Sequence, residues 1–151
     1  MRNRWVPTCC AAATVLAMAG CSSDPPDYQP PAGELVAGTA QVTVNGHDAG
    51  VTEAVQCDTT GWLTTITTGD QTSGVTAMLS AEDELAAESV SINNVGGFTG
   101  SYNAGAGGAE VEAAEVQMTG RTYDISGTAH GFKTDSPSFR TSGPFHIRVS
   151  C

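Results

Sequence analysis

The pattern of hydrophobic and polar residues divides this chain of 151 residues into two unlike parts. From about residue 40 onward, short runs alternate apolar with polar residues, which is the period of a strand with one buried face. Residues 41–44 alternate in this way, and Asn45-Gly46, a dipeptide favoured in two-residue hairpin turns, follows them directly. The pattern predicts strands at 41–44, 51–57, 62–68, 74–79, 89–92, 98–102, 110–118, 121–129 and 145–151.

The last of these runs is the most regular. Phe145, Ile147, Val149 and Cys151 alternate strictly with polar residues. Because side chains at every second position of a strand share a face, these four are predicted to face the core. The terminal cysteine is therefore expected to be buried.

Two segments depart from the strand pattern. Residues 81–88 combine strong helix formers with acids in the first turn and Ser80 as a possible N-cap, so they predict one short helix. Residues 132–143 are polar and contain a proline, which predicts a loop. The expected fold is mostly β, an antiparallel β-sandwich or half-barrel of about seven to nine strands with one short helix. Trp62 is expected to pack in the core rather than to mark a ligand pocket.

The first 20 residues have a different composition. Two arginines precede a mostly apolar run from Trp5 to Ala19, and small residues stand just before Cys21. This order is typical of a secretory signal, and the run is shorter than the roughly 20 residues that span a bilayer. A cysteine directly after the small residues predicts a lipoprotein signal, cleaved so that lipidated Cys21 becomes the N-terminus. Met18 replaces the leucine usual at its position, and an ordinary secretory peptide is the alternative.

Residues 21–39 form a proline-rich stretch that cannot build a core. We expect it to be an extended tether, able to hold a β domain of residues 40–151 up to roughly 50 Å from the lipid anchor. The alternative is that this stretch is a proline-rich ligand for a partner protein. No basic residues flank the prolines, so this alternative has weaker support.

The five cysteines fit this division. Cys9 and Cys10 lie in the predicted signal, and lipidation uses Cys21. The remaining two, Cys57 and Cys151, should pair in an oxidising compartment outside the cytoplasm.

Charge excludes some partners. Removing residues 1–20 leaves four basic and sixteen acidic residues, a net charge of −12. Nucleic acid is excluded as a partner because phosphate binding needs a basic patch. Attraction to anionic lipid is equally disfavoured, so membrane attachment must come from the acyl chains on Cys21.

The search for chemistry finds no active site. His47, His130 and His146 lack the spacing of metal ligands and are expected to be surface residues. The chain has no nucleophile elbow, phosphate loop or calcium loop, so we predict a non-enzymatic protein without metal or cofactor. The rival hypothesis is a carrier whose half-barrel holds an apolar envelope lipid, in a cavity under the helix at 81–88.

The order of features resembles a known family. The resemblance rests on the signal, on residues 42–48, 55–57, 66–70 and 90–97, and above all on 123–131 and 144–151. Across about residues 40–151 the chain resembles the mycobacterial nineteen-kilodalton lipoprotein antigen (LpqH) family.

This resemblance implies a lipoprotein of the cell envelope, anchored on the extracytoplasmic face of the cell membrane, without established enzymatic activity. It further implies three acyl chains on Cys21, recognised by host Toll-like receptor 2, and a disulfide between Cys57 and Cys151. The family antigen has a threonine-rich, glycosylated tether. Here Ser22, Ser23 and Thr39 are the hydroxyl residues of the tether, which disfavours glycosylation.

Overall fold

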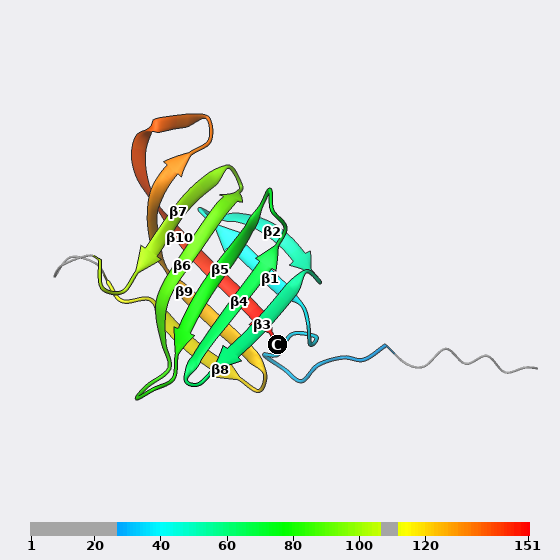
Figure 1. Cartoon of the computed structure of the whole chain (residues 1–151). Helices are drawn as coiled ribbons and strands as arrows, with labels where there is room; N and C mark the ends of the chain where they lie inside the picture. The colour runs from blue at the N-terminus through cyan, green and yellow to red at the C-terminus, as the bar shows by residue number, and fades with distance from the viewer. Residues whose placement is uncertain (1–26, 107–111) are drawn as a thin grey trace, which may run out of the picture.

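The computed structural model describes residues 27–106 and 112–151, and these residues form an antiparallel sheet of ten strands (Figure 1). The strands are β1 (Ala40–Val44), β2 (His47–Thr52), β3 (Val55–Thr60), β4 (Leu63–Gly69), β5 (Gly74–Ser80), β6 (Ala86–Val95), β7 (Phe98–Asn103), β8 (Glu115–Thr119), β9 (Thr122–Lys133) and β10 (Ser136–Ser150). The expected mostly β, antiparallel fold is confirmed.

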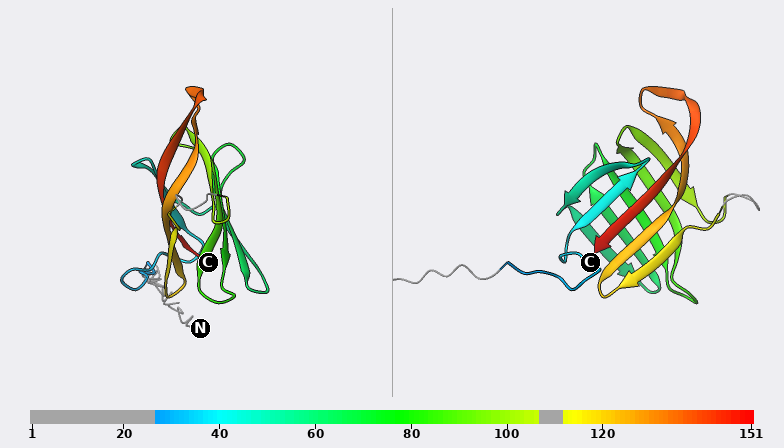
Figure 2. Two further views of the ribbon diagram at one scale, coloured as in Figure 1. Left: turned by 90° about the vertical axis from the view of Figure 1, so that its left-hand side faces the viewer. Right: turned by 180° about the vertical axis from the view of Figure 1, so that it is seen from behind.

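The sheet folds over on itself to make two layers. Its strand order is β2-β1-β10-β9-β7-β6-β5-β4-β3, and β8 pairs with β9 outside this path. Seen edge-on, β1, β8, β9 and β10 lie in one layer, and β3 to β6 lie in the other (Figure 2). The result is a sheet nearly closed into a barrel, with its two end strands, β2 and β3, on either side of a seam.

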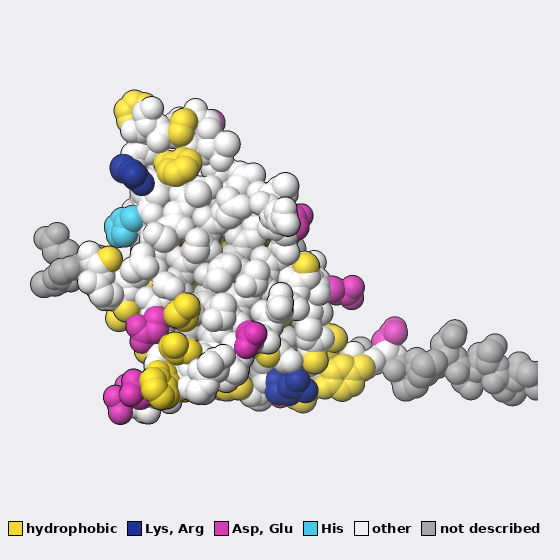
Figure 3. All heavy atoms as spheres, viewed as in Figure 1, with side chains coloured by type: hydrophobic (Ala, Val, Ile, Leu, Met, Phe, Trp, Pro, Cys, Tyr) yellow, Lys and Arg dark blue, Asp and Glu magenta, His cyan; other side chains and the backbone are white. Residues whose placement is uncertain are grey.

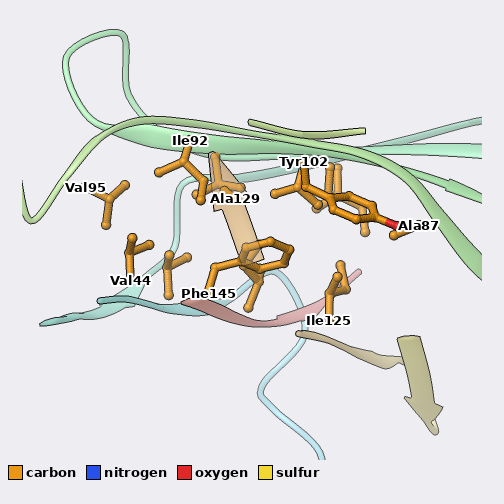
Figure 4. Close-up of a cluster of buried hydrophobic side chains, with 14 of the residues drawn as sticks. Val44, Ala87, Ile92, Val95, Tyr102, Ile125, Ala129 and Phe145 are labelled. Carbon is orange, nitrogen blue, oxygen red and sulfur yellow. The ribbon is translucent and has the colours of Figure 1, made fainter. Parts of the chain in front are cut away.

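The core lies between the layers, where the inward-facing residues of both meet (Figure 4). Phe145, Ile147 and Val149 are almost completely buried, as their alternation in the sequence predicts. Cys151 is half-buried and packs against the same cluster. The ring of Tyr102 meets that of Phe145 edge to face, with the ring centroids 6.3 Å apart.

The Asn45-Gly46 turn forms as expected. Asn45 and Gly46 both have positive φ, 52° and 75°, between the paired residues Val44 and His47. Asparagine and glycine tolerate this left-handed conformation, which matches the twist of the flanking strands. The turn therefore fixes the register of β1 and β2.

The predicted helix at 81–88 is wrong. The structure has a turn after Ser80, and β6 begins at Ala86. Ala87 is buried and pairs with Leu79 of β5. Burial of alternate residues of β6 between β5 and β7 outweighs the weak helix propensity of a segment this short.

Trp62 also differs from its expected place. It lies in the two-residue turn between β3 and β4, after Gly61, and 56% of its surface is exposed. A turn residue projects beyond the layers, so this large side chain cannot reach the core. The expectation that it packs in the core is wrong.

The predicted loop at 132–143 is a strand hairpin. β9 continues to Lys133, which pairs with Phe98 of β7 on one side and with Ser136, the first residue of β10, on the other. Backbone hydrogen bonds supply this pairing regardless of the polar side chains. The amide of Thr134 donates to the carbonyl of Gly97 at 2.8 Å, which holds the hairpin against the β6–β7 turn. The strand expected at 110–118 is seen as β8, and residues 110 and 111 lie outside the described residues.

Candidate functional site

The segment that precedes β1 is hydrogen-bonded to β9 and β10. Residues 33–39, which we call the docked segment, lie along β9 and β10 before β1 begins. The Arg148 Nη2 atom donates to the carbonyl of Gly33, and the amide of Leu35 donates to the Thr122 hydroxyl, each at 2.8 Å. The amide of Gly38 donates to the carbonyl of Ser150 at 2.8 Å. Part of the stretch that the sequence assigns to the tether is thus attached to the β domain.

Cys21, the predicted lipidation site, lies outside the described residues. The described chain approaches the domain from residue 27, at the end where β10 finishes (Figure 1). Cys151 ends the chain there, and its carbonyl accepts a 2.8 Å hydrogen bond from Arg121 Nη2. The docked segment and the C-terminus therefore share one end of the molecule, which we call the docked end.

The structure contains the disulfide between Cys57 and Cys151. Cys57 lies on the end strand β3, and Cys151 follows β10, which belongs to the opposite layer. No ladder in the described part of the chain joins these strands. The bridge thus makes a covalent link between the layers where the sheet makes none.

All three histidines are exposed, as expected. His146 Nε2 lies 2.7 Å from Asp124 Oδ1, and Arg148 Nε lies 3.5 Å from the other oxygen of that carboxylate. This group lies on an open strand face, with the His146 and Asp124 side chains 48% and 42% exposed. Among the described residues, no hydroxyl hydrogen-bonds to the His146 ring.

The described ranges, 27–106 and 112–151, hold no group of three or more residues suited to binding a metal. In the same ranges, no helix has the length and apolar character needed to cross a membrane.

Space for a ligand occurs at a different place from the one expected. The predicted helix at 81–88, which was expected to cover a ligand cavity, is absent from the described structure. Instead, a cavity of about 250 Å³ opens at the seam, between β1 and β2 on one side and the β4–β5 turn on the other. Gly74 and Val75 at the start of β5 line this cavity, whereas residues 81–85 follow the end of β5. The cavity and the expected site are therefore at opposite ends of this strand.

Sequence reasoning missed the seam cavity and the docked segment. The cavity depends on how the two ends of the sheet meet, which no local pattern reports. The docked segment left one readable sign, because Leu35 and Val36 interrupt the polar and proline-rich composition of residues 21–39.

A sequence model described as the Mycobacterium 19 kDa lipoprotein antigen matches residues 33–151. The chain belongs to this family. The match begins at Gly33, where the docked segment starts.

Individual relatives agree with this assignment. A protein of Mycobacterium indicus pranii described as a lipoprotein is 38% identical over the full length of both chains. Lipoprotein LpqH of Mycobacterium avium is 34% identical over 76% of this chain and 69% of its own length. Lipoprotein LpqH of Mycobacterium tuberculosis H37Rv is 32% identical, over 74% of this chain and 68% of its own.

Proposed function

We propose that this protein is a non-enzymatic lipoprotein, held on the extracytoplasmic face of the cell membrane by acyl chains on Cys21. The observation that carries the proposal is family membership over residues 33–151, with a signal-like segment and Cys21 directly upstream. One acyl chain gives only marginal membrane binding, so several chains on this cysteine would be needed for a stable anchor.

The geometry of the docked end supports this arrangement. The docked segment attaches the incoming chain to Thr122, Arg148 and Ser150, so the domain has a defined side from which a tether leaves. The opposite end of β10 carries the projecting β9–β10 hairpin (Figure 1). An anchor at Cys21 would leave this hairpin at the end of the domain farthest from the tether.

We further propose that the acylated N-terminus is the part that host Toll-like receptor 2 recognises. The support is the family, described as a lipoprotein antigen. Under this proposal the β domain presents the lipid and makes no contribution of its own to receptor activation.

Substitution of the anchoring cysteine tests both statements. Cys21→Ala should move the protein from the detergent phase to the aqueous phase in detergent partitioning, without changing its unfolding midpoint. It should also abolish activation of reporter cells that express the receptor. Cys9→Ala and Cys10→Ala are matched controls, since the mature protein should contain neither residue, and both variants should behave as wild type. A Cys21→Ala protein that stays wholly in the detergent phase would show that the anchor is elsewhere.

A further inference from the structure

The seam cavity results from the topology of the sheet. β2 and β3 are the two ends of the strand order, and they are consecutive in sequence, joined by Glu53 and Ala54. No hydrogen-bonded ladder joins them in the part of the chain that the structure describes. The interior therefore reaches the surface between β2 and the turn that connects β4 to β5.

The walls of the cavity combine an apolar floor with a polar rim. Val42, Val75 and Val95 form the floor, and each belongs to the buried core. Thr68, a buried polar residue, lies on one wall, and Asp70 lies at the rim. A ligand that fits must bring an apolar part for the valines and a polar part for the mouth.

The volume limits the apolar part. An apolar cavity of about 150 Å³ is enough to hold benzene, whereas sites for whole drug-sized ligands span roughly 300–1,000 Å³. At about 250 Å³, the seam cavity can take a short run of methylenes and leaves the remainder of the ligand outside.

Charge at the rim restricts the head group. The Asp70 carboxylate accepts hydrogen bonds from the Thr72 hydroxyl, at 2.6 Å, and from the amides of Thr72 and Ser73. These bonds stabilise the ionised form, so the rim is negative at neutral pH. An anionic head group would be repelled there, in a chain that already carries many more acids than bases. On the face shown in Figure 3, the Lys and Arg side chains stand apart from one another and form no basic patch.

We propose that the seam cavity binds the end of an alkyl chain whose head group is uncharged. The inference goes beyond membrane anchoring and needs no acyl chain on Cys21. It also moves the lipid-carrier hypothesis from the predicted helix at 81–88 to the seam.

Binding of alkyl glucosides with chains of six to twelve carbons tests the proposal. The titrations use the mature chain, residues 21–151, with Cys21→Ala, which lacks both the apolar run of residues 5–19 and any acyl chain, at ligand concentrations below micelle formation. Affinity should rise about fourfold with each methylene until the cavity is full, and then stay constant. Alkyl carboxylates of the same length should bind at least tenfold more weakly. Affinity that is independent of chain length, or carboxylates that bind equally well, would overturn the proposal.

Two substitutions on the same strand locate the binding. Ala49 lines the cavity mouth, whereas Val51, two residues along β2, does not line it and is 66% exposed. Ala49→Trp should lower glucoside affinity at least tenfold, and Val51→Trp should leave it within twofold. Unfolding midpoints establish that both variants fold.

Methyl resonances of Val42, Val75 and Val95 provide a readout that needs no variant. They should shift on addition of octyl glucoside, while those of Val149, which does not line the cavity, should not. Binding with no shift at the floor valines would place the ligand elsewhere and contradict the proposal.

Discussion

Arg148 on β10 donates a 2.8 Å hydrogen bond from Nη2 to the backbone carbonyl of Gly33. This bond, with those of Leu35 and Gly38, attaches the docked segment to the domain. This attachment shortens the tether predicted from the sequence to residues 21–32. At about 3.1 Å per residue in the extended proline-rich conformation, they reach at most roughly 40 Å.

Replacement of Arg148 tests this attachment. Arg148→Ala should speed hydrogen exchange at the amides of Leu35 and Gly38, because the docked segment loses a hydrogen bond worth about 1 kcal/mol. Asp124→Asn is the matched control. It removes the ion pair with Arg148 and leaves the bond to Gly33 intact. Equal exchange rates in Arg148→Ala and wild type would contradict the assigned role of Arg148.

We predict that the disulfide contributes a large part of the stability. It closes a loop with a sequence separation of 94 residues. Reduction should lower the free energy of unfolding by about 4–5 kcal/mol in the chain-entropy account, as measured by urea unfolding with and without reductant. The double variant Cys57→Ala, Cys151→Ala should have the same free energy of unfolding as the reduced protein, and reductant should not change it. A reduced protein with an unchanged midpoint would show that the bridge contributes nothing.

Tyr102 and Phe145, whose rings meet edge to face, should contribute unequally to the free energy of unfolding. Phe145→Ala should lower the unfolding free energy by about 3–5 kcal/mol, since it leaves a cavity in the core. Tyr102→Phe should cost about 1 kcal/mol, because its hydroxyl accepts a 3.0 Å hydrogen bond from the Ala114 amide. Tyr123→Phe is the control, since the Tyr123 hydroxyl has no hydrogen bond among the described residues. Equal losses for the two tyrosine variants would refute the role of the Ala114 bond.

Asp70 should titrate abnormally. The Thr72 hydroxyl, and then the amides of Thr72 and Ser73, hold the pKa of Asp70 below its ordinary value of 3.8. A lowered folded-state pKa stabilises the fold above pH 3.8, and this contribution is lost as the pH falls through the folded-state value. Thr72→Val should raise the Asp70 pKa toward 3.8 in a carboxyl carbon NMR titration. An unchanged Asp70 pKa in that variant would show that the Thr72 hydroxyl is not the main cause of the lowered pKa.

The sequence predicted the parts of this fold whose local signals agree with their surroundings. The alternation of Phe145, Ile147 and Val149 matches a strand with one buried face, and Asn45-Gly46 suits a turn with two positive φ values. In both places the side chains and the backbone favour the same structure, so a reading of the sequence is enough.

Prediction failed where tertiary contacts outweighed a local preference. Residues 81–88 favour a helix, yet burial of Ala87 against the core makes their last three residues a strand. The β9–β10 hairpin extends through polar residues because pairing requires only backbone groups. The seam cavity could not be predicted, because it depends on Val42 and Val75, which lie on strands far apart in the sequence. The assignment of Cys21 as the lipidation site rests on its local sequence pattern alone, and it stays a prediction.

Mass spectrometry of the N-terminal peptide, from protein purified out of the mycobacterial envelope, tests the central claim most directly. We predict a peptide that begins at Cys21 and carries the added mass of several acyl chains, and the same preparation of Cys21→Ala should lack it. A mature chain that begins at another residue, or that contains an unmodified Cys21, would contradict the proposal that this protein is a lipid-anchored member of its family.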